Sequence, residues 1–254
     1  MSAIKVLFGF HAVSVRIKTD PLSVVDVYFD ASRRDQRMRQ FVSRTKEANI
    51  RLIEADSARL SKLCGSMGHQ GVVARAHDVA LAKSLDDLLD KVDQDANQTP
   101  LILVLDGVTD PHNLGACLRV ADGAGVQAVI APKDHAAGIN ATVAKVASGA
   151  AETVPYFMVT NLARTLNELK ERHIWVIGTS EDADHTIYQT NLKGPVALVL
   201  GAEGPGMRQL TRKTCDALVR IPMSGAVESL NVSVASGVCL FEAMRQRQHA
   251  PGQS

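Results

Sequence analysis

LILVLDGVTDPHNLGACLR, residues 101–119, begins with five consecutive apolar residues. A strand that is apolar throughout is expected where helices cover both faces of a sheet. A polar segment follows, in which Asp110 or Asn113 can cap a helix that continues through Leu114. Strand, polar turn and helix together form the repeating unit of a parallel α/β sheet. The stretch therefore predicts an α/β protein with a parallel sheet.

The same alternation of strand and helix patterns extends on both sides of this stretch. After it, we expect strands over 128–131, 154–157, 174–178, 196–200 and 217–221, and helices over 114–123, 141–147, 162–172 and 232–247. Before it, we expect helices over 10–17, 33–48 and 56–63, and strands over 24–29, 50–54 and 71–76.

An acidic amphipathic segment and a polar string that ends at Pro100 separate these two regions and are typical of a linker. We therefore expect a small α/β domain over 1–78, a linker over 79–100, a larger doubly wound domain over 101–249 and a tail over 250–254.

The composition excludes several classes of protein. With 254 residues, of which 46% are hydrophobic, the chain can bury a substantial core. No run of eighteen apolar residues indicates a membrane span, and no leader pattern is found at the start. The histidines and cysteines lack metal-ligand spacing, so we expect no metal and interpret the cysteines as core residues in a reducing cytoplasm. These cysteines are Cys64, Cys117, Cys215 and Cys239.

The basic charge is concentrated in the first third of the chain. The net charge is only +1, but residues 1–78 carry 13 Lys and Arg against 8 Asp and Glu. In the expected helix over 33–48, Arg33, Arg34 and Arg37 could contact the phosphates of a nucleic acid. A solvated helix face, with Asp35 and Glu47 among the basic residues, fits the charge pattern equally well.

Three polar loops follow strands of the larger expected domain, at the edge where open α/β sheets bind ligands. The first loop carries Asn113 and leads to Arg119, which lies about 9 Å further along the helix. The second, GAEGPG, begins at Gly201 and places Glu203 directly after a strand. Taken singly, Asn113 could be a helix cap, Arg119 a surface residue and the glycine loop a tight turn.

The third loop contains Ser229 and Asn231, either of which could cap the last helix. Its interpretation depends on the other two loops, because the ends of parallel strands should bring all three to one edge of the sheet. We therefore expect a composite site at this edge.

At these loops the sequence resembles the SPOUT class of RNA methyltransferases, in its TrmH-like branch that methylates ribose 2′-hydroxyls. The resemblance rests on residues 110–119, 201–204 and 229–233, in the order of that branch's motifs. The segments GFHAV at 9–13 and GHQGV at 68–72 are similar to an L30e-like RNA-binding domain of family members that act on 23S ribosomal RNA.

The resemblance implies a SPOUT α/β-knot domain, with a trefoil knot in a parallel sheet, after an L30e-like substrate-binding domain. It implies S-adenosylmethionine as the cofactor, held by the main chain at Gly201, Ile221 and Leu230. It also implies a homodimer, which suits the apolar residues of the last helix. Those residues are Val234, Val238, Leu240 and Phe241.

The implied reaction is methylation of a guanosine 2′-hydroxyl in 23S ribosomal RNA, in the peptidyl-transferase region. By the resemblance, Arg119 contacts the target phosphate and hydroxyl and assists deprotonation, while Asn113 orients Arg119 or the ribose. Glu203 holds the polar network, and Ser229 and Asn231 position the substrate or the cofactor loop.

Three alternatives are a tRNA 2′-O-methyltransferase, a non-catalytic RNA-binding module and a nicotinamide-dependent dehydrogenase. The dehydrogenase is disfavoured because the GxGxxG fingerprint follows the first strand of neither domain. The joint presence of Asn113, Arg119, Glu203 and Asn231 argues against a module without activity.

Overall fold

The computed structural model describes residues 4–77, 84–95 and 98–248. The chain divides into two compact units, Met1–Leu81 and Ala82–Ser254. In the described part of the chain, no helix has the length and apolar character needed to cross a lipid bilayer.

The first unit is built on a four-stranded sheet of order β1-β4-β2-β3. Its strands are β1 (Ile4–Phe8), β2 (Val24–Phe29), β3 (Leu52–Glu54) and β4 (Val72–His77), with helices α1 (Phe10–Thr19), α2 (Gln36–Glu47) and α3 (Ser57–Cys64) and short 3-10 turns η1 (Pro21–Ser23) and η2 (Met67–His69). Strand β4 is antiparallel to β1 and β2, and β2 is parallel to β3.

Two cores lie on opposite faces of this sheet, because successive strand side chains alternate between its faces. Val27 and Val72 pack with α1 and α2, whereas Tyr28 and Val73 pack with Leu60 of α3. The helices and strands expected for this unit are confirmed, apart from their exact ends. Strand β1 was not predicted, since only a short apolar run marks it.

The start of α2 corrects one sequence interpretation. The helix begins at Gln36 and not at residue 33, because Asp35 is the N-cap, with an extended backbone and a side chain that accepts a hydrogen bond from the Met38 N–H. Arg33 and Arg34 therefore precede the helix. Asp56 caps α3 in the same way, by accepting a hydrogen bond from the Arg59 N–H.

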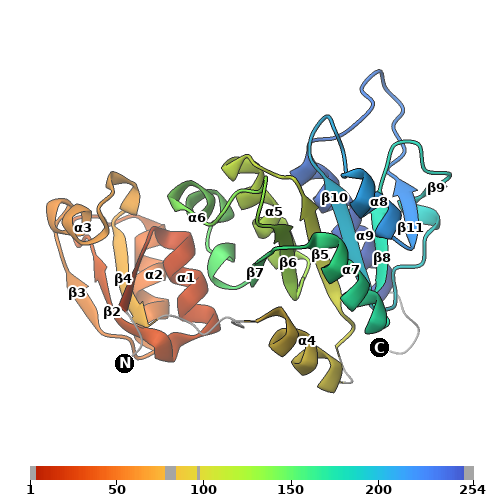
Figure 1. Cartoon of the computed structure of the whole chain (residues 1–254). Coiled ribbons are helices and arrows are strands. Elements are labelled where there is room, and N and C mark those ends of the chain that lie inside the picture. Colours follow the sequence, from red (N-terminus) through yellow and green to blue (C-terminus); the bar gives the residue numbers. More distant parts are fainter. Residues whose placement is uncertain (1–3, 78–83, 96–97, 249–254) are drawn as a thin grey trace. The chain divides into compact units, whose positions relative to one another are not determined.

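The second unit contains a seven-stranded parallel sheet of order β7-β6-β5-β10-β8-β11-β9 (Figure 1). Its strands are β5 (Leu101–Asp106), β6 (Ala128–Pro132), β7 (Tyr156–Val159), β8 (Trp175–Thr179), β9 (His185–Thr186), β10 (Val196–Gly201) and β11 (Ala217–Arg220). Its helices and 3-10 turns are α4 (Leu85–Gln94), α5 (Pro111–Gly123), α6 (Ala141–Ala147), η3 (Ala150–Glu152), α7 (Leu162–Glu171), η4 (Ile187–Gln189), α8 (Gln209–Thr214) and α9 (Val232–Gln248).

Helices cover both faces of this sheet, as the apolar strands predicted. Along β5, Leu103 packs with α5, α6 and α9, and Val104 packs with α4 and α7 on the other side. The expected doubly wound parallel domain is confirmed. The short elements α8 and β9 were not predicted. Leu240 belongs to the core beside α5, so it is not part of an exposed face of the last helix.

Helix α4 lies inside the segment whose composition is typical of a linker. Leu88, Leu89 and Val92 join the core of the second unit. Arg172 at the end of α7 donates to Asp93 at 2.8 Å and lies 2.7 Å from Asp90. Helix α4 therefore packs with the second unit, and the two units divide between Leu81 and Ala82. Residues 78–83 and the expected tail, 250–254, lie outside the described residues.

Replacing a buried side chain of α4 tests this packing. Leu89→Ala should lower the free energy of unfolding by about 2–5 kcal/mol, because it leaves a cavity against the sheet. Lys91→Ala, at an exposed position of the same helix, should change it by less than about 0.5 kcal/mol. Urea unfolding of both variants measures the difference, and equal stabilities would contradict the assignment of α4 to this core.

Candidate active site

The segments that follow β5 and β10 carry two of the candidate site residues, Asn113 and Glu203. These strands pair in parallel with Gly201 opposite Asp106, so the turns that follow them leave the sheet side by side. After β5, Asp110 caps α5 by accepting a hydrogen bond from the His112 N–H at 2.9 Å. Of the two possible caps, Asp110 takes this role and leaves the Asn113 side chain available for other contacts.

Three polar side chains from the three loops meet at this edge. Asn231 Nδ2 donates to Asn113 Oδ1 at 3.0 Å and also to Glu203 Oε1. Asn113 Nδ2 donates to the same Glu203 oxygen at 3.3 Å. The predicted convergence of the three loops is therefore confirmed for these residues.

Asn231 also organises the start of α9. Its Oδ1 accepts hydrogen bonds from the Ser233 N–H at 2.9 Å and the Ser233 hydroxyl at 2.6 Å, and its carbonyl accepts from the Ala235 N–H. The expected cap is therefore confirmed, since one end of the Asn231 amide caps the helix, and the other end joins the polar cluster.

Arg119 stands apart from this cluster. It is exposed on α5, about 9 Å along the helix from Asn113. Within the described residues, its guanidinium group forms no hydrogen bond or ion pair with the protein.

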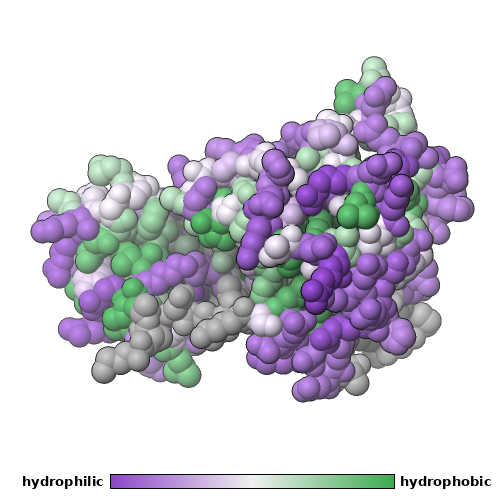
Figure 2. Space-filling view, in the orientation of Figure 1, coloured by the Kyte–Doolittle hydropathy of each residue, from purple (hydrophilic) through white to green (hydrophobic). Residues whose placement is uncertain are grey.

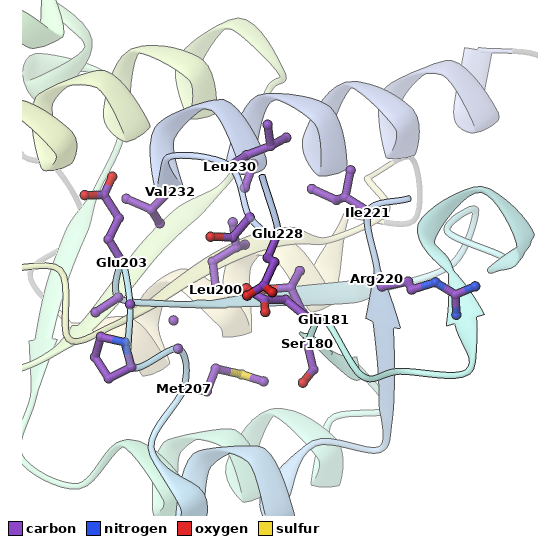
Figure 3. Close-up of a pocket in the computed structure, with 18 of the residues that line it drawn as sticks. Ser180, Glu181, Leu200, Glu203, Met207, Arg220, Ile221, Glu228, Leu230 and Val232 are labelled. Atoms are coloured by element: carbon purple, nitrogen blue, oxygen red, sulfur yellow. The ribbon is translucent and has the colours of Figure 1, made fainter. Parts of the chain in front are cut away.

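A pocket of about 360 Å³ opens beside the cluster (Figure 3). Gly201, Glu203, Ile221, Ser229 and Leu230 all line it. Figure 3 also shows Leu200, Met207 and Val232 around it, with the carboxylates of Glu181 and Glu228. Three residues expected at the cofactor and two expected in catalysis therefore border one cavity, whereas Asn113, Arg119 and Asn231 are not among its lining residues.

Position 201 requires a glycine because the loop that follows it folds back against it. Ala202 and Gly206 exchange two main-chain hydrogen bonds, which fold the loop back over the end of β10. A Cβ atom at Gly201 would lie 2.1 Å from the carbonyl carbon of Gly206, a distance that no side chain tolerates. The glycine loop is thus a tight turn that shapes one wall of the pocket.

A second wall is a projecting loop over residues 222–231, between β11 and α9 (Figure 1). Figure 2 shows hydrophobic surface at its tip. Val227 of this loop is 66% exposed. Met223, Glu228, Ser229 and Leu230 of this segment line the pocket.

Comparison with known proteins identifies the family. The model of the SpoU rRNA Methylase family matches residues 100–241, and a model described as RNA 2'-O ribose methyltransferase substrate binding matches residues 6–81. The chain belongs to the SpoU rRNA methylase family. A relative from Ralstonia nicotianae, named 23S rRNA (guanosine-2'-O-)-methyltransferase RlmB, is 62% identical over 100% of both chains. The protein of that name from Bordetella pertussis is 56% identical over 98% of this chain and 100% of its own.

Solved structures agree with this assignment. A crystal structure titled RNA 2'-O ribose methyltransferase has a TM-score of 0.71 and 26% identity, and covers 96% of this chain and 89% of its own. The SpoU methyltransferase AviRb from Streptomyces viridochromogenes, in complex with AdoMet, has a TM-score of 0.71 at 24% identity over 97% of this chain and 92% of its own. The expected SPOUT fold class is thus confirmed.

Two ion pairs and one arginine–carbonyl contact that hold the SpoU site together were not predicted. The buried Asp106 accepts hydrogen bonds from Arg208 N at 2.9 Å and Nε at 2.7 Å, which fixes the far end of the glycine loop. Asp106 directly follows the apolar run 101–105, a signal that could have singled it out. Its arginine partner lies 102 positions away and carries no local signal.

The loop after β8 is held by two further arginines that line the pocket. Arg212 Nη2 donates to both carboxylate oxygens of Asp182 at 2.8 Å, and Arg220 Nη1 donates to the Asp184 carbonyl at 2.7 Å. The Arg212 hydrogen bonds, with that of Ser180, lower the pKa of Asp182 to about 2. Asp182 therefore stays ionised, and its ion pair with Arg212 persists, at neutral and mildly acidic pH.

The basic residues expected to contact RNA differ in their surroundings. Arg33 is half-buried and bound to Asp35 and the Gln70 carbonyl, and its guanidinium carbon lies 5.1 Å from the centre of the Phe10 ring. Arg34 and Arg37 are exposed. The tight contacts of Arg33 within its own unit make it a structural residue in addition to any role with RNA.

The cysteines are free thiols. Cys117 and Cys239 are core residues, as predicted, and burial raises their pKa values to about 11 and about 12. Among the residues that the structure describes, no group of three or more His, Cys, Asp and Glu side chains could hold a metal ion.

A substitution at the glycine turn tests the shape of the pocket. Gly201→Ala should lower the free energy of unfolding by about 1–3 kcal/mol, because the added methyl group forces the loop away from β10. It should also remove any rise in Tm on adding S-adenosylmethionine, the expected cofactor. Gly194→Ala, where a Cβ atom meets nothing within 4 Å, is the matched control. A cofactor-dependent rise that survives in Gly201→Ala would show that the turn does not shape the binding pocket.

Proposed function

We propose that this protein transfers a methyl group from S-adenosylmethionine to the ribose 2′-hydroxyl of a guanosine in 23S ribosomal RNA. The observation that carries the proposal is the cluster of Asn113, Glu203 and Asn231 beside a pocket, in a chain 62% identical to an enzyme named for this reaction. The family resemblance leads us to propose that this guanosine lies in the peptidyl-transferase region. It also leads us to propose the cytoplasm as the compartment of the protein.

The pocket fits the cofactor in size and chemistry. Its volume of about 360 Å³ lies in the range of small-molecule sites, and Leu200, Ile221 and Val232 offer apolar contacts for an adenine ring. Main-chain groups at Gly201, Ile221 and Leu230 would hold the adenine and ribose. When bound, S-adenosylmethionine supplies a methyl group that its positive sulfur has already activated.

The protein's own residues must align the hydroxyl and help to remove its proton. Arg119 is proposed to bind the target phosphate and hydroxyl, where its permanent positive charge stabilises the developing alkoxide. Asn113, fixed by Glu203 and Asn231, orients the ribose or Arg119, and Ser229 positions the substrate at the pocket wall. Alignment of the hydroxyl with the methyl group supplies a large part of the rate enhancement.

A homodimer and a trefoil knot are part of the proposal. On α9, Val234 and Phe241 are 51% and 44% exposed and lie on one face with the half-buried Val238. An exposed apolar strip on a helix is typical of a protein interface. A second copy of the chain would cover it.

Ribosomal RNA is favoured over tRNA by the first unit. A substrate-binding family model matches residues 6–81. By contrast, the structure titled A. aeolicus TrmH/SpoU tRNA modifying enzyme, at a TM-score of 0.55 and 30% identity, covers only 65% of this chain and 84% of its own.

Methyl transfer from labelled S-adenosylmethionine tests the reaction directly. With ribosomal RNA from cells that lack the protein, we expect one new alkali-resistant 2′-O-methylguanosine in the large-subunit RNA. Transfer to tRNA alone would support the proposed methyl-transfer reaction but contradict ribosomal RNA as its substrate. No transfer to either RNA, from protein that binds the cofactor, would favour a binding module without activity.

The role of Arg119 can be separated from cofactor binding. Arg119→Ala should lower the rate of transfer at saturating cofactor by about 10²–10³-fold, because it removes a charge that acts in the transition state. The Kd for S-adenosylmethionine should change by less than twofold, since Arg119 does not line the pocket. Arg164→Ala, at an exposed arginine of α7, should leave both quantities unchanged. Weakened cofactor binding in Arg119→Ala, at an unchanged rate with saturating cofactor, would contradict the assigned role.

A further inference from the structure

The first unit contains a groove between α1 and α2 that the proposed reaction does not use. Its volume is about 310 Å³. Helix α1 contributes one side of the groove and α2 the other. The lining residues are Phe10, His11, Ser14 and Val15 from α1, and Arg37, Gln40, Phe41 and Arg44 from α2.

The groove has an apolar floor and polar walls. Phe10 and Phe41 are buried and meet edge to face, with ring centres 5.5 Å apart. His11 and Ser14 are three residues apart on α1, so they project from one side of that helix. Both can donate and accept hydrogen bonds.

The wall on α2 carries the positive charge. Arg37, Gln40 and Arg44 recur at helical spacing on one side of α2, and all three are exposed. The Arg37 guanidinium carbon lies 4.5 Å from the centre of the Phe10 ring, so an aromatic contact supports this planar group at the groove. Arg44 forms no ion pair with any described residue.

We propose that this groove binds one unpaired nucleotide of the RNA substrate. The base stacks on the Arg37 guanidinium plane, and its hydrogen-bonding edge meets Gln40, Ser14 and His11. Arg44 binds a neighbouring phosphate. The inference rests on the proposed function for the identity of the ligand as RNA.

The chemistry of the groove matches this ligand. Proteins read single-stranded RNA by stacking splayed bases on aromatic rings or guanidinium planes and by bonding to their polar edges. The volume is small, which limits the occupant to about one nucleotide and excludes a duplex. The positive charge of Arg44 complements a phosphate beside the stacked base, and no acidic residue lines the groove.

Binding of the full-length protein to an unmodified 23S ribosomal RNA transcript, measured at several salt concentrations, tests the proposal. Gln40→Ala should weaken binding at least fivefold without changing the salt dependence, because it removes a contact to a base. Arg44→Gln should weaken binding and reduce the slope of log K against log salt by about 0.7, the value for one phosphate of a single strand.

Arg39→Gln is the matched control, since Arg39 is exposed on α2 but points away from the groove. It should leave the affinity within twofold of the wild type. Equal effects of Arg39→Gln and Arg44→Gln would mean that general charge attracts RNA to α2, and would overturn the proposal. Unchanged binding in Gln40→Ala would do the same.

Photocrosslinking separates this inference from the proposed function. With a transcript that contains 4-thiouridine, crosslinks to peptides spanning residues 10–15 or 37–44 support the groove whether or not methyl transfer occurs. If the protein methylates the RNA but crosslinks only elsewhere, the proposed function stands and the groove assignment fails.

Discussion

The parallel pairing of β5 with β10 is the constraint on which the site depends. It sets Asp106 level with Gly201, so the turn toward α5 and the glycine loop leave the sheet at the same height. Both strands are buried along their length, and a slip by one residue would turn their apolar side chains to the opposite faces. The packing of the core therefore fixes the register, and the register fixes the separation of Asn113 and Glu203. The Asp106–Arg208 pair then secures the far end of the loop.

The last helix completes the site because its first residues take part in both packing and polar contacts. Val232 and Leu240 bury α9 in the core beside α5. This packing brings Asn231, immediately before the helix, to Asn113 at the start of α5. The polar cluster is thus a consequence of helix docking, and loosening of α9 would open the cluster and the pocket wall together.

The sequence predicted this arrangement where the signal is local. Apolar runs marked the strands of the larger unit, and polar residues after them marked the edge where Asn113, Glu203 and Asn231 meet. The start of α2 was misplaced because Asp35, which was interpreted as one charge among several, is the helix cap. The arginines at positions 212 and 220 could not be found, because their partners lie 30 and 36 positions away and no periodic pattern joins them. Strand β1 was missed because its apolar run is too short to distinguish a strand from a loop.

The choice of asparagine at position 231 follows from the two contacts that its side chain makes. The capping of α9 needs only an acceptor, a role that an aspartate or serine fills equally well. The contact with Glu203 needs a donor, and an aspartate there would place a second carboxylate against the first, which disfavours the ionised form of both. A serine hydroxyl is too short to reach both Ser233 and Glu203. An amide, with an acceptor at one end and donors at the other, satisfies both demands. Helix capping alone would accept asparagine, aspartate or serine at position 231. The contact with Glu203 is what specifies asparagine.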